Sequence, residues 1–416
     1  MKKLNIALLH YSCPPVVGGV EEVVSQQASL FHRYFQKVKI FAGMGAQFSD
    51  YFQVEINPLL GSRNKKVLNA HKFAREGNLK PIESLTLKIY KYLKRSLQDF
   101  DILIAHNVLT MHLNLPLTYA LLRLAEEDFI PIISWNHDSP YFYPDCPAYL
   151  EEEPWNIIKQ YNPKVYYVVI SESRKKQFEK LYGKGNNMHV VLNGIDPITF
   201  FGLSPLTIRL IQEQDLFDAD FLMVQPSRLH PRKNVELSIR VIRALKDKGV
   251  NARLLITGAH DPHGSREVEY YKEILSLARK LNVKKDILIM AEYKFKSGQR
   301  LVPSRIIMRD LYLISDILFM PSSQEGFGIP LLESGMIKLP VVCSNIFPFK
   351  EVGSNEVCLF KLSETPEEVA EKILNLLSVR KSNRFFRRVI KDYTWDNIYK
   401  EKLLPLLTEI KEKNLK

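Results

Sequence analysis

The residues from 321 to 333 combine two carboxylates with two glycines and a proline, at spacings that could bind a ligand. Gly326 and Gly328 allow a tight turn and a close approach of backbone amides, and Pro330 suits the first turn of a helix. The free N–H groups of a helix N-terminus are a ready site for an anion. Glu325 and Glu333 would repel a phosphate, so we expect each to bind uncharged hydroxyl groups. Amides for phosphate and acids for hydroxyls together predict recognition of a sugar nucleotide.

Glu333 also has a purely structural interpretation, because the helix dipole favours an acid in the first turn by about 0.3–1 kcal/mol. Glycine is scarce in this chain, with 18 in 416 residues against an average usage of about 7%, which argues for a functional pair. The stretch resembles the Glu-x7-Glu signature of the retaining family 4 glycosyltransferases. The resemblance implies that Phe327, Gly328, Ile329 and Glu333 bind the donor, and that Glu325 is catalytic and faces the hexose.

A basic pair follows the first strand expected in the second half of the chain. Arg228 and Lys233 lie in one loop, where a bidentate guanidinium and a point charge could both reach a diphosphate. A solvated basic loop is the alternative. The segment resembles the family's Arg-x4-Lys phosphate clamp, although the family commonly has Gly or Glu where this chain has His230, Pro231 and Arg232. The resemblance implies that Arg228 and Lys233 bind the donor and stabilise the departing diphosphate.

Two adjacent glycines, Gly18 and Gly19, directly follow the first expected strand and open a helix. They would let a ligand approach the backbone, although a tight turn explains them equally well. Family 4 enzymes look similar here, which implies that this loop faces the donor phosphate and the acceptor.

His137 and Asp138 follow another expected strand, so both should lie at its carboxyl end. A lone histidine is more often structural, but the resemblance implies that His137 contacts the transferred sugar as a catalytic residue. His106 and Asn107, at the end of the preceding strand, are expected to line the acceptor pocket.

A third loop, at residues 258–264, contains Gly258 and could suggest a metal site through His260, Asp261 and His263. The position at a strand end favours a loop beneath the nucleotide instead, with Gly258 in the donor site. Members of the family use no bound metal, so we expect neither a metal nor a cofactor besides the co-substrate.

These residues need strands that end at a common edge, and the hydrophobic pattern supplies them. A chain of 416 residues with 46% hydrophobic content exceeds what one core usually holds. Strands alternate with helices, which predicts parallel sheets covered on both faces. Strands are expected at 4–9, 38–41, 101–105, 131–135, 165–170, 221–224, 253–257, 287–290, 317–320 and 340–343.

The predicted fold class is α/β, with two Rossmann-like doubly wound domains facing a cleft, and the resemblance implies the GT-B architecture. The expected domains are residues 1–197 for the acceptor and 219–392 for the donor, joined by a linker at 198–218. The resemblance also implies that a helix at 393–416 crosses back to the first domain. The pair Asn193–Gly194 resembles the Asn-Gly turn that precedes the linker in the family, and a turn with a positive backbone angle would explain it.

The net charge is +12 and is concentrated in part between residues 61 and 95. A helix expected at 85–97 carries Lys88, Lys91, Lys94 and Arg95 away from its apolar stripe, which suits weak peripheral contact with an anionic membrane. An ordinary outer helix of the first domain is the alternative, and the better explanation of the stripe. No nucleic-acid motif accompanies the charge. The four cysteines form no metal or disulfide pattern, so we expect a cytoplasmic protein, with any membrane contact at the inner face.

The function implied is a metal-independent, retaining transfer of a hexose from a nucleoside diphosphate sugar to an acceptor hydroxyl on a glycan, a lipid-linked compound or a small molecule. No carboxylate pair is placed for double displacement, so no nucleophile is predicted. Two alternatives stay open. One is a sugar-nucleotide epimerase of the same fold, and the other is a non-catalytic nucleotide-binding partner.

Overall fold

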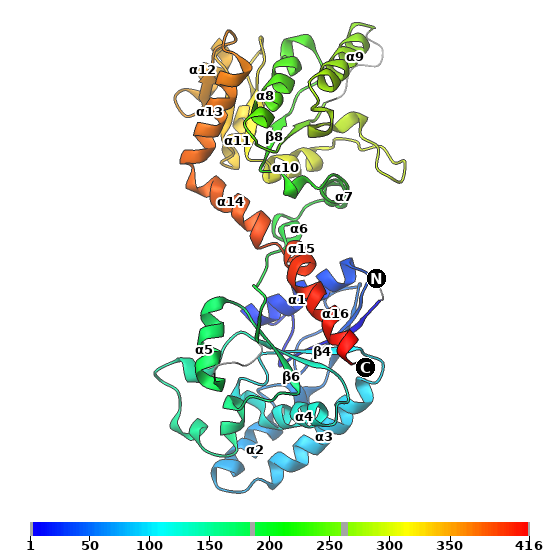
Figure 1. Cartoon of the computed structure of the whole chain (residues 1–416), viewed down its shortest axis with the longest axis vertical. Coiled ribbons are helices and arrows are strands. Elements are labelled where there is room, and N and C mark those ends of the chain that lie inside the picture. The colour runs from blue at the N-terminus through cyan, green and yellow to red at the C-terminus, as the bar shows by residue number, and fades with distance from the viewer. Residues whose placement is uncertain (1–2, 184–187, 259–264, 415–416) are drawn as a thin grey trace. The chain divides into compact units, whose positions relative to one another are not determined.

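The computed structural model describes residues 3–183, 188–258 and 265–414, with the side chains of 265–267 left out. The chain divides into two compact units (Figure 1). The first unit comprises residues 1–196 together with 393–416, and the second comprises residues 197–392. Among the described residues, no helix is both long and apolar enough to cross a bilayer.

The first unit is built on a seven-stranded sheet in the order β3-β2-β1-β4-β5-β6-β7. Every strand pair is parallel. The strands are β1 Asn5–His10, β2 Lys37–Ala42, β3 Gln53–Ile56, β4 Ile102–His106, β5 Ile132–Asn136, β6 Val165–Val169 and β7 Met188–Val190. The helices between them are α1 Gly19–Arg33, α2 Lys65–Arg75, α3 Lys80–Ser96, α4 Leu115–Glu126 and α5 Glu172–Tyr182.

Both faces of this sheet are buried, as a parallel sheet requires. Successive residues of β1 alternate between the faces: Ile6 and Leu8 pack in the core that contains α1, and Ala7 and Leu9 pack in the core that contains α3 and α4. The inner strands therefore read as continuous apolar runs, which is why the sequence predicts them, whereas it misses the edge strands β3 and β7.

The second unit repeats the plan with a six-stranded parallel sheet in the order β10-β9-β8-β11-β12-β13. The strands are β8 Phe221–Gln225, β9 Ala252–Ile256, β10 Ile287–Ile289, β11 Ile317–Met320, β12 Val341–Ser344 and β13 Cys358–Phe360. The helices are α6 Pro197–Phe201, α7 Pro205–Gln214, α8 Val235–Asp247, α9 Ser265–Lys280, α10 Arg305–Ile314, α11 Ile329–Met336, α12 Phe347–Gly353, α13 Pro366–Val379 and α14 Lys381–Asp392.

Both sheets thus have the strand order of a doubly wound Rossmann-like fold, and the predicted pair of such folds is confirmed. In each sheet the order reverses beside the first strand, between β1 and β4 in one unit and between β8 and β11 in the other. Ligands of open α/β sheets bind at this switch point, outside the carboxyl ends of the strands.

Some parts of the chain differ from the sequence-based expectation. The segment predicted to be a linker forms α6 and α7, and its Leu203 and Leu210 are buried in a core of the second unit. The region between residues 42 and 79, where no strand or helix is predicted, contains β3 and α2. These elements are short, and a short element contains too few residues for a clear periodic pattern, which explains why the sequence does not predict them.

The C-terminal segment lies in the first unit and is not one regular helix. It consists of α15 Trp395–Ile398, a π-helical turn Tyr399–Leu403 and α16 Leu404–Lys413. Pro405 has no backbone N–H to donate, so the regular hydrogen-bond ladder cannot run through it. The apolar side chains of the segment still complete a core of this unit.

Gly194 differs from expectation in its reason rather than its place. The φ of Gly194 is not positive. A Cβ on Gly194 would lie 2.7 Å from the Trp395 ring, so the glycine is needed for close packing against the C-terminal segment and not for a left-handed turn.

Candidate functional site

Two of the predicted site residues of the second unit, Lys233 and Glu325, meet at its switch point, because β8 and β11 are neighbouring strands. The loop after β8 contains Arg228 and Lys233, and the loop after β11 contains Glu325. The backbone N–H of Ser323 donates to the Arg232 carbonyl over 2.8 Å and joins the two loops. Lys233 and Glu325, which are 92 positions apart in the chain, thereby lie side by side.

Glu325 is the centre of this arrangement. Its carboxylate is paired with Lys233, and Arg232 Nη1 lies 3.3 Å from Oε2. The Ser322 hydroxyl donates to Oε1 over 2.8 Å. The side chains of Lys233 and Glu325 are 12% and 10% exposed, so this ion pair is largely buried and is not a solvated surface pair. The carboxylate is therefore fixed in direction, as a residue that orients a substrate must be.

A buried polar chain sets the position of the Lys233 backbone. Gln225, at the end of β8, donates from its side chain to the Lys233 carbonyl over 3.0 Å and accepts from the buried Ser238 hydroxyl over 2.7 Å. Asn234 then adopts a left-handed conformation with φ of 50°, which reverses the chain into α8. The placement of the lysine is thus built into the fold of the loop.

Arg228 is exposed and has no ion-pair partner among the residues that the structure describes, so its guanidinium is available to a ligand. Gly258 lies against the backbone of this loop, and its N–H donates to the Ser227 carbonyl over 3.0 Å. A Cβ on Gly258 would meet that oxygen at 2.3 Å. The glycine is required for the close approach of the loops after β8 and β9. His260, Asp261 and His263 lie outside the described residues.

The start of α11 has the predicted form. Gly328 has φ of 110°, and a Cβ there would press on the Phe349 ring at 3.1 Å, so this position requires glycine. Pro330 occupies the first turn, and no side chain caps the helix N-terminus. Phe327 and Ile329 are 51% and 61% exposed, which leaves this turn open to a ligand. Gly326 has neither a positive φ nor a crowding neighbour, so its glycine is not needed for the turn.

Glu333 is exposed on α11 beside a pocket of about 500 Å³ formed with α10. The hydroxyl of Tyr312 donates to Glu333 Oε2 over 2.7 Å. Burial, the hydrogen bond and the charge of Glu333 all raise the pKa of Tyr312, so the tyrosine remains a donor. The other carboxylate oxygen of Glu333 has no hydrogen-bond partner among the described residues, and the contact with Tyr312 is one that the sequence does not reveal.

In the first unit, three histidines from the ends of three neighbouring strands form a buried row. His10 Nδ1 lies 2.7 Å from the His106 carbonyl oxygen, and His106 Nδ1 lies 3.2 Å from His137 Nε2. Burial, and then the nearby His10, lowers the pKa of His137 to about 3. Burial likewise lowers the pKa of His10 and of His106. All three rings are therefore neutral near pH 7.

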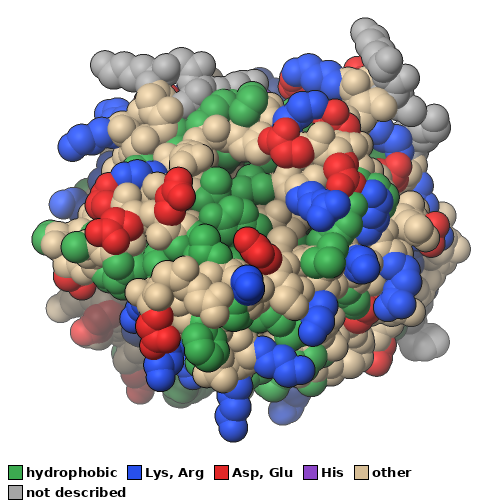
Figure 2. All heavy atoms as spheres, turned by 90° about the horizontal axis from the view of Figure 1, so that it is seen from below, with side chains coloured by type: hydrophobic (Ala, Val, Ile, Leu, Met, Phe, Trp, Pro, Cys, Tyr) green, Lys and Arg blue, Asp and Glu red, His purple; other side chains and the backbone are tan. Residues whose placement is uncertain are grey.

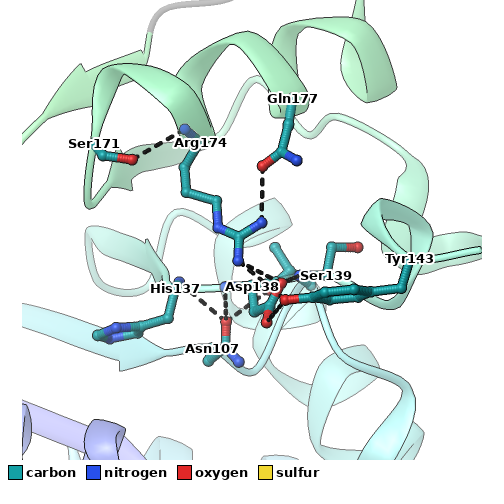
Figure 3. Close-up of polar contacts among 9 residues, drawn as sticks. Asn107, His137, Asp138, Ser139, Tyr143, Ser171, Arg174 and Gln177 are labelled. Atoms are coloured by element: carbon teal, nitrogen blue, oxygen red, sulfur yellow. Dashed lines mark hydrogen bonds and ion pairs between the residues drawn. The ribbon is translucent and has the colours of Figure 1, made fainter.

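Asn107 holds the loop that carries His137 (Figure 3). Its side-chain oxygen accepts from the backbone N–H groups of His137 and Asp138 over 3.1 and 2.9 Å. Asn107 itself has φ of 54°, a conformation that asparagine tolerates better than most residues. Asp138 does not approach the histidine row. Instead its carboxylate pairs with Arg174 of α5 at 3.1 Å and accepts from the Tyr143 hydroxyl over 2.7 Å.

The loop with Gly18 and Gly19 leads into α1 as expected. Gly18 is extended, and a Cβ on it would lie 2.1 Å from the Glu21 carboxylate, so Gly18 makes room for that side chain. Glu21 also accepts from the Ser12 hydroxyl over 2.5 Å and lies 3.8 Å from His10 Nε2. Gly19 has open space where a Cβ would stand.

Sequence reasoning missed the cluster of His10, Ser12 and Glu21. A signal was present, since His10 ends β1 as His106 ends β4, and polar residues at strand ends mark the ligand edge of such sheets. The burial that makes these residues a cluster, with His10 6% and Ser12 9% exposed, becomes visible only in the folded chain.

Comparison with known proteins agrees with this geometry. Residues 208–392 match the family described as glycosyl transferases group 1, a stretch that contains Arg228, Lys233, Glu325 and Glu333. The chain is 24% identical to a mannosylglucosylglycerate synthase of Petrotoga mobilis, over 82% of each chain. It is also 24% identical to a mannosylglucosylglycerate synthase of Thermotoga maritima, over 83% of this chain and 82% of that protein.

A third relative is an uncharacterised glycosyltransferase of Methanocaldococcus jannaschii, which is 26% identical over 56% of this chain and 57% of that protein. The family match and these relatives, together with two Rossmann-like units, support a glycosyltransferase of the GT-B type that contains a glycosyl transferases group 1 domain at residues 208–392.

Proposed function

We propose that the protein is a retaining glycosyltransferase that moves a hexose from a nucleoside diphosphate sugar to an acceptor hydroxyl. The observation that carries this proposal is the convergence of Lys233 and Arg232 on Glu325 at the switch point of the second sheet. Cations for a diphosphate thus stand beside a fixed carboxylate for sugar hydroxyls.

The cations supply the catalysis in this proposal. As the glycosidic bond to the diphosphate breaks, negative charge grows on the departing oxygen, and Arg228, Lys233 and the amides at the start of α11 stabilise it. Arg228 is free to bind, whereas Lys233 is paired with Glu325 and must share its charge with the incoming diphosphate. These groups take the place of a metal ion, so the reaction proposed is metal-independent and needs no other cofactor.

The remaining residues orient the donor. Glu333, held by Tyr312, binds the hydroxyls of the ribose, and Glu325 binds those of the hexose. Retention at the anomeric carbon, and with it membership of family 4, is proposed from the resemblance of the Glu325–Glu333 stretch to the signature of that family. His137 would contact the hexose as a neutral ring, because its pKa of about 3 keeps it uncharged.

The acceptor is assigned to the first unit, whose strand ends carry His106, Asn107 and the Gly18–Gly19 loop. Two relatives are named for a mannosyl-containing product. GDP-mannose therefore belongs with UDP-glucose among the first donors to test.

A donor screen tests the proposal. The protein is incubated with each nucleoside diphosphate hexose and a cell-extract acceptor fraction, and mass spectrometry follows hexose transfer and diphosphate release. Transfer that requires an acceptor supports the proposal. Conversion of the donor sugar without any acceptor would instead identify an epimerase, and donor binding without turnover of any kind would identify a non-catalytic binding partner.

A further inference from the structure

The first unit contains a pocket of about 740 Å³ at the ends of β1 and β4. Its lining residues include a polar group, His10, Glu21 and Asn107, and a basic group, Arg63 and Lys65. It is large enough for a ligand of several sugar-sized units, and all of its lining residues belong to this one unit.

The polar group offers atoms that have no hydrogen-bond partner among the described residues. His10 is 6% exposed and its Nδ1 faces a carbonyl oxygen, which can only accept, so Nδ1 carries the proton and Nε2 is left as an acceptor. At 3.8 Å from Glu21, Nε2 is too distant for a hydrogen bond. The Asn107 amide nitrogen is a donor without a partner among the described residues, on a side chain whose residue is 8% exposed.

These groups suit hydroxyls. A hydroxyl can donate to His10 Nε2 or to the Glu21 carboxylate and accept from the Asn107 amide, which satisfies polar atoms that would otherwise stay unpaired in a sheltered place. The neutral His10 ring and the Glu21 carboxylate would not by themselves attract an anion, so the polar group favours a polyol.

The basic group supplies positive charge to the same pocket. Arg63 and Lys65 are exposed, and neither has an ion-pair partner within the described part of the chain. Lys65 is the first residue of α2, which has no acidic residue in its first turn. The positive end of a helix dipole disfavours a cation by about 0.3–1 kcal/mol. Stability alone would thus place an acid where this chain has lysine, and the positive charge needs another reason.

We infer that this pocket binds the acceptor, and that the acceptor is a polyhydroxylated compound bearing an anionic group, a carboxylate or a phosphate. Its anionic group lies against Arg63 and Lys65, and its hydroxyls face His10, Glu21 and Asn107. This inference rests on the proposed function for the word acceptor, whereas the binding of an anionic polyol can be measured without any transfer.

Calorimetric titration of the full chain with glucose 6-phosphate and with glucose tests the charge requirement. Glucose 6-phosphate should bind and glucose should bind at least about tenfold more weakly, since a hydrogen bond to a charged group contributes that much or more. Equal affinity for the two probes would overturn the inference.

The double variant Arg63→Ala/Lys65→Ala should lose about tenfold or more of the affinity for glucose 6-phosphate. The matched control is Lys66→Ala/Lys72→Ala, which removes the same charge from exposed residues of the same helix that do not line the pocket. Circular dichroism should show both variants folded, because Lys65 does not stabilise its helix end. An equal loss in both double variants would mean general charge attraction and would overturn the site.

Two further arms separate the sources and the two proposals. Phosphatidylglycerol vesicles present a polyol phosphate on a lipid. Binding to them that is lost in Arg63→Ala/Lys65→Ala but kept in the control supports the site with a lipid acceptor, whereas binding of neither probe overturns it. GDP-mannose and UDP-glucose are titrated into the same samples. In the unsubstituted protein, binding of glucose 6-phosphate without binding of either donor refutes the proposed function alone, and binding of a donor without binding of glucose 6-phosphate refutes this inference alone.

Discussion

At the residue scale, the ion pair between Lys233 and Glu325 determines how the donor loop responds to substitution. Lys233→Ala and Arg228→Ala should each weaken donor binding by about 1.5–3 kcal/mol, or roughly 10- to 150-fold, because each removes a charged partner of the diphosphate. Arg240→Ala, an exposed arginine on α8, is the control and should have no effect. Calorimetry with the donor measures all three, and wild-type affinity in both loop variants would refute the clamp.

The two glutamates are expected to differ in role. Glu333→Gln should weaken binding of the free nucleoside diphosphate and of the sugar nucleotide alike, because the ribose is common to both. Glu325→Gln should reduce hexose transfer more than it reduces binding of the free diphosphate. Tyr312→Phe is a milder version of the first change, since it only frees Glu333. Equal losses for both ligands in both glutamate variants would show that the division is wrong.

His137 makes a prediction about pH. Its folded pKa of about 3 is below the ordinary value of 6.5, so the unfolded chain binds more protons between these values. The stability contributed by keeping this ring neutral is complete above about pH 6.5 and is lost progressively as the pH falls toward 3. His137→Gln should flatten the dependence of the unfolding free energy on pH in that window, and exposed His32→Gln should not. Denaturant unfolding at several pH values measures the slope, and an unchanged slope in His137→Gln contradicts the assignment.

At the element scale, α3 resolves part of the membrane question. The predicted stripe is buried, with Leu85, Ile89 and Leu93 packed inside the unit, so the apolar side of this helix is not available to lipid. Lys94 is paired with Glu127 at 2.6 Å. Figure 2 shows the first unit from the side of α2 and α3, where lysine and arginine side chains surround areas of hydrophobic side chains and acidic groups are scattered among them. The membrane attraction predicted next therefore rests on the exposed basic residues and not on the buried stripe.

We predict weak, salt-sensitive binding of the protein to anionic vesicles and none to neutral vesicles. Lys88, Lys91 and Arg95 stay exposed on α3, and Lys88 and Lys91 have no ion-pair partner in the described chain. A basic residue near an anionic surface contributes about 1 kcal/mol. Lys88→Glu/Lys91→Glu should reduce sedimentation with the vesicles, whereas Lys284→Glu/Lys285→Glu on the second unit should reduce it less. Protein that stays in solution with both vesicle types at low salt would favour a soluble acceptor.

At the scale of the whole molecule, the chain leaves the first unit at residue 196 and returns to it at residue 393. The return is fixed by Trp395, which is 1% exposed, packs on Gly194 and donates from its indole N–H to Gln26 over 2.5 Å. Arg33 pairs with Asp196 and Asp396, which ties together the two points where the chain crosses.

Trp395→Ala should destabilise the first unit by about 3–5 kcal/mol, because it removes a fully buried ring. Gly194→Ala should also destabilise it, since the new Cβ would overlap that ring. Phe385→Ala, with a side chain from a residue that is 63% exposed on α14, is the control. Calorimetric unfolding measures each change, and nucleoside diphosphate binding to the second unit should survive in all three. An unaltered unfolding profile of Trp395→Ala would refute the role of the C-terminal segment.

The sequence by itself predicted the inner strands of both parallel sheets but missed β3, β7 and β13 at their edges, and it singled out the residues proposed to bind the donor. Buried parallel strands are continuous apolar runs, and Arg228, Lys233 and Glu325 lie in loops that follow such runs, while Glu333 lies on the helix after the last of these loops, so local pattern was enough to single them out. It could not determine the linker, where apolar residues of α6 and α7 carry too little periodicity to be distinguished from an irregular segment.

Only the tertiary structure decided which residues meet. The pairing of Lys233 with Glu325, the support of Glu333 by Tyr312 and the row of three histidines each join residues far apart in the chain. Such contacts depend on the order of strands in a sheet, and a strand's own sequence does not state its neighbours. The pocket lined by His10 and Lys65 could not be predicted from the sequence for the same reason, because its lining residues come from segments that only the folded first unit brings together.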